Sequence, residues 1–388
     1  MTHAESTGVH QPLTPFLSVE PGASQRHENL TIFPLISGVQ PDLPYLLLGD
    51  ALASGAVSIG ELGSGSVPSL VASNKGEVDV LILDGEQLIG AKQNRITNRT
   101  IILESITETV IPVSCMEQGR WHHVTDEFRS RPKPRHAPSR IRRKAREVEA
   151  SLAGSPMQAS ASMLHQAQGA VWHEIREVGA SLGVSSDTGA MDEIYDRHTG
   201  SLDDWIARFP IEDDQVGLLA FLGGRPLGMD VVGSGSLYAR LHERFLGGYC
   251  MDALAARGNR KRDNGGPSSA AAARFLSKVG STTRGKAPTV GAGTYHLLSG
   301  QAIGAELTAV VDHTERLVHL SAFPGERPRG AGHGPGGSHA DESPIASPSR
   351  ETWLGHRTGL RRELRPVHGP RGAPGPTPHC HTPAVNFR

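Results

Sequence analysis

The chain has 388 residues and a formal net charge of −1, with 46 glycines and 27 prolines. A charge so close to zero creates no long-range field that would recruit nucleic acid or a membrane surface, so we expect neither as a specific partner. Three cysteines, Cys115, Cys250 and Cys380, are odd in number and far apart, which excludes a disulfide framework and a paired-cysteine metal site.

Neither a membrane span nor a secretory leader is predicted. The apolar runs are shorter than the ~20 residues that a spanning helix needs. Residues 1–26 lack a basic start followed by an apolar region. Because the cysteine pattern also suits a reducing compartment, the sequence predicts a cytoplasmic protein.

The first part of the chain predicts a small sheet. Residues 1–27 are polar and mixed, which favours a flexible N-terminus. Short runs of β-forming residues follow from residue 30 onward, and glycine, serine and proline separate them. This spacing is typical of short strands in one sheet layer.

Residues 78–121 combine apolar β-formers with unusual polar residues. The run 78–83 ends at Asp84-Gly85, and Asp-Gly between apolar runs predicts a hairpin with a return strand over 86–91. Further strands are predicted at 100–103 and 110–113. Pro112 cannot donate to a ladder, so its strand is expected to lie at an edge or to end there.

Polar side chains follow these strands. If the segments stay extended, a period of two places Lys92 with Asn94 on one face and Gln93 with Arg95 on the other. If the two strand ends are neighbours, the side chains around one pocket are Lys92, Asn94, Arg95, Glu117, Gln118, Arg120 and Trp121. Arginine suits phosphate, glutamate accepts from hydroxyls and tryptophan stacks, so this set fits a hydroxyl-rich or phosphorylated ligand. The alternative is a solvated strand end with local salt bridges.

The same stretch carries a resemblance. The pattern L-D-G-E-x-L-I-G-A-K-Q-N-R, followed by I-P-V-S-C-M-E-Q-G-R-W, resembles the prokaryotic family called the ARG and rhodanese-phosphatase superfamily-associated protein domain. ARG denotes ADP-ribosylglycohydrolase. The likeness covers about Asn29 to Phe323. The resemblance implies no established activity, but the family's association with genes that handle ADP-ribose and NAD implies a ligand of that class.

A basic run and a helical segment come next. Residues 129–146 contain nine arginines and lysines, which we interpret as a linker entering a solvated helix face, with nucleic-acid contact as the weaker alternative because aromatic residues are missing. Apolar residues from Leu164 to Leu182 repeat at helical spacing. A helical segment is therefore predicted over about 138–209.

Strands return after this segment. Residues 216–228 repeat the outline of 83–90, and 298–304 form a third copy. Each copy is an apolar strand, a glycine turn, and a return strand with a second glycine that favours a bulge or a close backbone approach. The recurrence indicates duplicated sheet units, although short glycine hairpins also recur by chance. His319, in a last strand over 317–323, is interpreted as an ordinary sheet histidine.

Residues 324–388 differ from everything before them. They are dense in Pro, Gly, Arg, His and Ser with few large apolar side chains. Such a segment cannot bury enough surface to offset its ordering entropy, so a disordered tail is predicted.

The resulting expectation is an α+β fold of short antiparallel strands and hairpins, with duplication of the hairpin units as an open alternative, an inserted helical segment and a single domain over 28–323. Three functions stay open. One is a binding module for a small phosphorylated ligand held by Asn94, Arg95, Gln118, Arg120 and Trp121. Another is a hydrolase on such a ligand, with Glu86 or Glu117 as acid or base and Lys92 stabilising charge. The third is a scaffold for a partner protein. No metal site is predicted, and no cofactor is identified.

Overall fold

The computed structural model describes residues 11–38, 40–66, 68–120, 124–131, 133–152, 161–259 and 266–325. The chain divides into two units, Met1–Gly330 and Ala331–Arg388, and all described residues belong to the first. The tail predicted to be disordered lies outside the described residues from position 326 onward, and so does Trp121.

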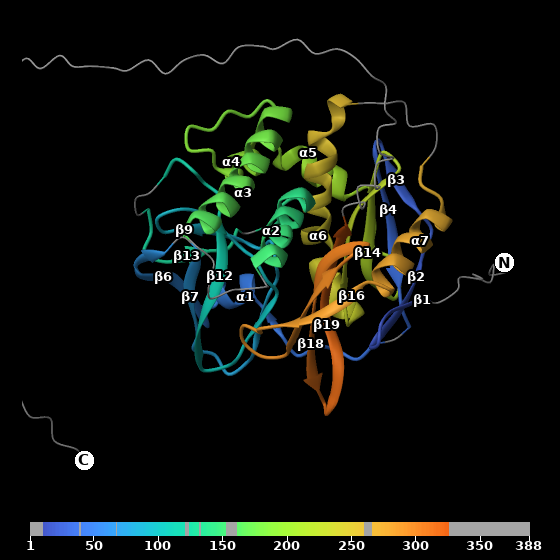
Figure 1. The fold of residues 1–388 in the computed structure, drawn as a ribbon, viewed down its shortest axis with the longest axis horizontal. Coiled ribbons are helices and arrows are strands. Elements are labelled where there is room, and N and C mark those ends of the chain that lie inside the picture. Colours follow the sequence, from blue (N-terminus) through green and yellow to red (C-terminus); the bar gives the residue numbers. More distant parts are fainter. Residues whose placement is uncertain are drawn as a thin grey trace, which may run out of the picture. The chain divides into compact units, whose positions relative to one another are not determined.

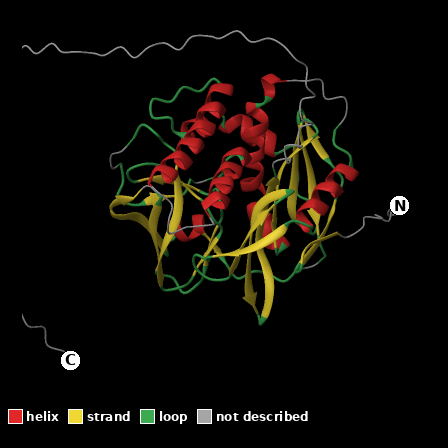
Figure 2. Ribbon diagram, viewed as in Figure 1, coloured by secondary structure: helices red, strands yellow, loops and turns green. Residues whose placement is uncertain are grey.

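The described residues form an α+β fold, as predicted (Figures 1 and 2). The helices are α1 (Leu48–Ala53), α2 (Ser139–Leu152), α3 (Ala161–Ser181), α4 (Met191–Arg197), α5 (Thr199–Ile206), α6 (Gly235–Ala255) and α7 (Ser269–Gly280). The strands are β1 (Gln11–Thr14), β2 (Leu17–Pro21), β3 (Gln25–His27), β4 (Leu30–Ile36), β5 (Leu46–Leu47), β6 (Val57–Ser66), β7 (Ser69–Asn74), β8 (Val80–Ile82), β9 (Gln87–Gly90), β10 (Arg95–Thr97), β11 (Ile101–Leu103), β12 (Thr107–Cys115), β13 (Phe128–Arg129), β14 (Gln215–Leu222), β15 (Arg225–Val232), β16 (Thr283–Ala287), β17 (Thr294–Ser299), β18 (Ala302–Val311) and β19 (Thr314–Pro324).

The strands form three sheets. The largest has ten strands in the order β1-β2-β4-β14-β15-β19-β18-β17-β16, with β3 also paired to β4. The second has six strands in the order β13-β9-β10-β12-β7-β6, and the third is β11-β8-β5. The pairs are antiparallel except for β5 with β8. The helices α2 to α5 lie between residues 139 and 206, within the range 138–209 over which a helical segment was expected.

The N-terminus differs from its prediction. Residues 11–27, expected to be flexible, form β1 to β3 and join the ten-stranded sheet. Leu13, Leu17 and Val19 are buried in a cluster with Phe275 of α7. Although the segment is polar on average, these few apolar side chains bury surface against the sheet, and that burial stabilises the strands.

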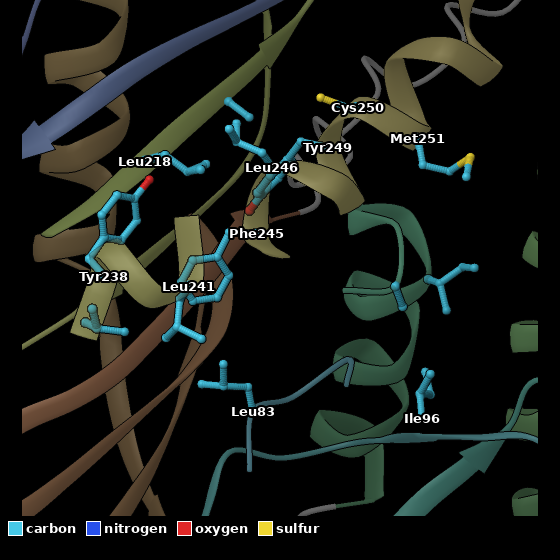
Figure 3. Packing of buried hydrophobic residues seen from close by; sticks show 14 of the residues in the cluster. Leu83, Ile96, Leu218, Tyr238, Leu241, Phe245, Leu246, Tyr249, Cys250 and Met251 are labelled. Atoms are coloured by element: carbon cyan, nitrogen blue, oxygen red, sulfur yellow. The ribbon is translucent and has the colours of Figure 1, made fainter. Parts of the chain in front are cut away.

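Helices cover both faces of the ten-stranded sheet. On one face, α7 packs Phe275 and Leu276 into a cluster with Phe33 and Phe221. On the other face, α6 contributes to the largest cluster of buried residues. Figure 3 shows Tyr238, Leu241 and Phe245 projecting from α6 in a cluster that also contains Leu83 and Leu218.

The predicted hairpin at Asp84-Gly85 is absent. β8 and β9, on either side of this dipeptide, belong to different sheets, because β8 pairs with β11 and β9 pairs with β10. Asp84 and Gly85 still form a turn, closed by the amide of Glu86 donating to the carbonyl of Leu83 at 3.3 Å, but Asp84 is buried there and makes ion pairs with α2. By contrast, the predicted glycine hairpins at 223–224 and 300 form, as β14–β15 and β17–β18.

The second glycine of these repeats marks a close backbone approach. A Cβ at Gly304 in β18 would lie 2.1 Å from the carbonyl oxygen of Ser321 in β19. At Gly90, the corresponding glycine of the first copy, a Cβ would lie 2.9 Å from the carbonyl oxygen of Glu127. Both positions therefore exclude a side chain.

Pro112 lies inside the six-stranded sheet, not at its edge. β12 pairs with β7 up to Pro112 and with β10 from Val113 onward. The proline occupies the point where the pairing passes from one neighbour to the other, so its missing N–H interrupts no regular ladder.

Candidate functional site

The predicted strand ends meet. β10 lies between β9 and β12, with Arg95 opposite Leu88 on one side and opposite Cys115 on the other. The residues after β9 and after β12 therefore lie at the same end of the six-stranded sheet. The central assumption of the sequence analysis, that these two ends are neighbours, is confirmed.

Arg120 is the centre of the polar cluster at this end. Its Nε donates to Glu117 Oε2 at 2.8 Å, and its Nη2 lies 2.7 Å from the same oxygen. Nη1 donates to the carbonyl oxygen of Ala91 at 2.8 Å, and Nη2 also donates to Asn94 Oδ1 at 3.1 Å. These contacts hold the planar guanidinium in one orientation. We call Asn94, Glu117 and Arg120 the strand-end cluster.

Backbone groups anchor the cluster. The amide of Asn94 donates to Glu117 Oε2 at 3.3 Å, and Asn94 Oδ1 accepts from the amide of Gly90 at 3.1 Å. Thr188, before α4, donates its hydroxyl to Glu117 Oε1 at 2.8 Å, and its carbonyl accepts from the amide of Gly119 at 2.8 Å. The inserted helical segment thus fixes the loop after β12.

The contacts of Glu117 keep it charged. Burial alone would raise the pKa of its carboxyl, but hydrogen bonds from Arg120, Thr188 and the Asn94 amide outweigh burial and lower the pKa below its ordinary value. A carboxylate in this state is a poor proton donor. Both of its oxygens are already engaged by neighbours, which identifies Glu117 as the residue that positions Arg120.

This lowered pKa predicts an acid-dependent loss of stability. The folded state favours ionised Glu117, so its contribution is present above the unfolded-state pKa and is lost as the pH falls through the lower folded-state pKa. Glu117→Gln should therefore be less stable than wild type at neutral pH, and the difference should shrink below about pH 4.5, the ordinary glutamate value. Urea unfolding at a series of pH values measures the effect, with the exposed Glu177→Gln on α3 as control. A difference that stays constant with pH would contradict the assignment.

The other residues predicted for the site lie in environments that differ from that of the strand-end cluster. Arg95 is fully buried, where Nη1 donates to the carbonyl and to Oε1 of Gln93 at 3.1 and 3.2 Å, and Nη2 lies 3.6 Å from Glu61 Oε1. The condition for the predicted alternation is not met before β10, because residues 91–93 form bends and not an extended strand. Arg95 contacts Gln93 and Glu61, whereas Asn94 contacts Arg120.

Lys92 and Gln118 lie nearer the surface. Lys92 is half-buried, and its backbone amide donates to Glu61 Oε1 at 3.3 Å. Gln118 is exposed, and its Oε1 accepts from Arg176 of α3 at 2.6 Å. Trp121 follows Arg120 directly in sequence but lies outside the described residues.

Glu86 belongs to a separate network. Its side chain is buried, with Oε1 accepting from Arg244 Nη1 of α6 at 2.8 Å and Oε2 accepting from the amide of Leu83 at 3.2 Å. Burial raises the pKa of this carboxyl, and Arg244 opposes that shift. Glu86 and Glu117 thus pair with different arginines, which does not match the shared pocket that two catalytic carboxylates require.

The structure contains a second polar cluster that the sequence did not predict. Arg142 of α2 makes a bidentate contact with Asp230 of β15, at 2.9 and 2.6 Å, and donates from Nη2 to Asp84 Oδ1 at 3.0 Å. Arg146 donates to Asp84 Oδ2 at 3.0 Å. We call Asp84, Arg142, Arg146 and Asp230, together with His319 of β19, the buried ionic network.

His319 connects this network to the three-stranded sheet. Its Nδ1 lies 2.7 Å from the hydroxyl of Thr100, and its Nε2 lies 3.2 Å from Asp230 Oδ1. Both ring nitrogens of His319 have partners, which agrees with the prediction of an ordinary histidine in a sheet. Burial alone would raise the pKa of the Asp84 and Asp230 carboxyls, but Arg142 holds both pKa values well below their ordinary range.

Three side chains of this network are of kinds that commonly ligate metal ions: Asp84, Asp230 and His319. One potential ligand atom from each residue lies within 4.8 Å of the others. Arg142 makes hydrogen bonds to both carboxylates, so its guanidinium supplies the positive charge that a cation would bring. The negative charge of the two carboxylates is therefore already balanced by an arginine of the same chain, and we assign no metal to this group.

The basic run over 129–146 is partly buried and partly solvated, because Lys133 is exposed and Arg143 half-exposed to solvent while Arg142 is buried. Carboxylate partners within 4.0 Å exist for Arg131, Lys133, Arg135, Arg140, Arg142, Arg143, Lys144 and Arg146. Arg135, Arg142 and Arg146 are buried. A segment whose charges are neutralised in this way offers little to a nucleic-acid backbone.

Comparison with protein families decides the relationship of the chain. Residues 18–323 match the profile of the ARG and Rhodanese-Phosphatase-superfamily-associated Protein domain, ARPP-1. The chain belongs to the ARPP-1 family. Both polar clusters lie inside the part of the chain that the ARPP-1 profile covers. Searches of curated proteins and of solved structures found no match.

Among the helices of the described residues, none combines the length and the apolar character that crossing a membrane requires.

The two described cysteines are expected to be unreactive. Cys115 is fully buried, and burial raises the pKa of its thiol to about 11, with Arg95 opposing the shift. Burial also raises the pKa of the Cys250 thiol. With Cys380 replaced by serine, an aromatic disulfide reagent at about pH 8 should label neither thiol in the folded protein and both after denaturation. Rapid labelling of folded Cys115 would contradict this expectation.

Proposed function

We propose that the domain binds a small phosphorylated ligand of the sugar-phosphate or nucleotide type at the strand-end cluster. Arg120 is 8 % exposed and hydrogen-bonded through all three nitrogens, so it would exchange one of these partners for the phosphate. The observation that carries the proposal is the fixed guanidinium of Arg120, held by Glu117, Asn94 and a backbone carbonyl. A group that is ordered before the ligand arrives loses little entropy on binding.

The surroundings of Arg120 favour an anionic, polar ligand. Half-buried Lys92 adds a second positive charge on the loop after β9, and exposed Gln118 adds an amide beside Arg120 in sequence. Trp121, the next residue, would supply a stacking face. The family's association with ADP-ribosylglycohydrolase supports ADP-ribose and related nucleotides as the first ligands to test.

We favour binding over hydrolysis at this site. A hydrolase would need a carboxyl group that is free to exchange protons with substrate or water. Glu117 is engaged in holding Arg120, and Glu86 is buried against Arg244. We therefore assign Glu117 and Asn94 to positioning, and Lys92, Gln118, Arg120 and Trp121 to the ligand.

A thermal-shift screen of the full chain tests this proposal. The panel contains ADP-ribose, NAD, ribose 5-phosphate and unphosphorylated ribose. A ligand at 100 times its dissociation constant adds about 2.7 kcal/mol to the unfolding free energy. We expect phosphorylated members to raise the melting temperature and ribose to leave it unchanged.

Variants locate the site. Arg120→Met should abolish the shift, whereas Arg274→Met, a matched change on the exposed face of α7, should leave it intact. A folded wild-type protein that shifts with none of these ligands would contradict the proposal and favour the scaffold for a partner protein. A shift that survives in Arg120→Met would place the ligand elsewhere.

A further inference from the structure

A separate pocket with a volume of about 260 Å³ lies beside α5 and α6, and it shares no residue with the strand-end cluster. The two helices contact each other (Figure 1), and the chain that leaves α5 forms one wall. Pockets for drug-sized ligands span roughly 300–1,000 Å³. The smaller volume here suits a molecule of amino-acid size and is too small for a dinucleotide.

Five residues with apolar side chains line the pocket, from Ile206 to Ile211 without Arg208. Phe209 is buried beneath it, while Ile211 at its edge is 44 % exposed, one of the few large apolar side chains that the described surface leaves uncovered. His242 of α6 forms part of the wall, with Nε2 at 2.8 Å from the carbonyl of Phe209 and Nδ1 at 3.0 Å from the hydroxyl of Tyr238. Because both ring nitrogens are engaged, His242 shapes the pocket and leaves recognition to other groups.

Opposite charges lie at the rim. Lys133 Nζ is 3.0 Å from Asp203 Oδ2, and the Lys133 side chain is 66 % exposed. Asp203 also pairs with the buried Arg135, so Lys133 can turn toward another carboxylate without leaving Asp203 unpaired. An exposed ion pair of this kind contributes little stability, so exchanging its partner costs little.

Glu243 supplies the negative group. Its side chain is 71 % exposed, and its Oε2 lies 3.9 Å from Arg135 Nη1, beyond hydrogen-bond distance. Its carboxylate can therefore accept from an ammonium group at the mouth of the pocket.

We propose that this pocket binds a free amino acid with an apolar side chain. The carboxylate of the ligand would pair with Lys133, its ammonium with Glu243, and its side chain would cover Ile211 and rest on Phe209. The rim carries charges of both signs, which complements a zwitterion better than a singly charged molecule.

Saturation-transfer NMR with L-leucine and the full chain tests the proposal. Saturation should reach the leucine methyl protons in the presence of wild type. It should fall by at least half in Lys133→Met, Glu243→Gln and Ile211→Ser, and it should persist in Lys278→Met, an exposed control on α7.

Analogues of leucine distinguish specific binding in the pocket from non-specific contact with the protein surface. 4-Methylpentanoic acid lacks the ammonium group, 3-methylbutylamine lacks the carboxylate and L-serine lacks the apolar body, so each should receive clearly less saturation than leucine. Equal transfer to the analogues, transfer unaffected by the three pocket variants, or no transfer from folded wild type would each overturn the proposal. None of these outcomes bears on the phosphorylated ligand, because the two sites have no residue in common.

Discussion

Replacing Arg142 with leucine is expected to lower the unfolding free energy by about 3–5 kcal/mol, the usual cost of removing one partner from a buried ionic network. Arg142 neutralises Asp230 and Asp84, and all three side chains are at most 3 % exposed. Without the guanidinium, the two carboxylates would remain close together in the interior, partly compensated by Arg146 at Asp84 and by Tyr249 and His319 at Asp230. Urea unfolding monitored by circular dichroism measures the loss.

Two further variants make this result specific. Arg143→Leu changes the next residue of α2, which is half-exposed and pairs with Glu147, and should cost less than about 1 kcal/mol. Adding Asp84→Asn to Arg142→Leu removes one of the uncompensated charges, so the double variant should recover part of the stability. Equal losses for Arg142→Leu and Arg143→Leu would mean that the buried ionic network does not hold the sheets together.

Phe245→Ala is the second large effect, with an expected cost of about 3–5 kcal/mol. The ring of Phe245 is fully buried and stacks on His319 at a centroid distance of 5.6 Å. It also meets the edge of His136 at 4.9 Å and stacks with Tyr238 at 6.2 Å. Its removal would leave a cavity between α6 and the ten-stranded sheet (Figure 3).

A conservative replacement of Phe245 shows whether the stability loss comes from the missing side-chain volume or from any change at this position. Phe245→Leu keeps most of the apolar volume and should cost less than about 1.5 kcal/mol. Chemical unfolding of both variants provides the comparison. If alanine and leucine had the same effect, cavity formation would not be the cause.

Local patterns were sufficient to predict much of this fold. The short apolar runs and their glycine separators predicted the strands around 30–36 and 216–228, and helical spacing predicted α3. The same local reasoning failed at Asp84-Gly85, where the dipeptide forms a turn between strands of different sheets and Asp84 contacts α2. Arg142 lies 58 residues from Asp84 and 88 from Asp230. Local sequence periodicity gives no information about contacts over such distances along the chain.

The candidate site was predictable in part for the same reason. Asn94 and Arg95 contact different partners, as period-two alternation predicts, although residues 91–93 are bends and not a strand. The ends of β9 and β12 lie on either side of β10. The contribution of Thr188 comes from a segment 71 residues from Glu117. The burial within the basic run was not predicted, because its carboxylate partners on α4, α5, α6 and β15 are distant in sequence.

The most direct test of the proposed function is a phosphorus NMR titration of ADP-ribose with the full chain. Our account predicts that wild type and Arg274→Met shift or broaden the phosphate resonances in a saturable manner, and that Arg120→Met leaves them unchanged at the same protein concentration. Resonances unaffected by folded wild type, or affected equally by Arg120→Met, would contradict the assignment of Arg120 as the phosphate-binding residue.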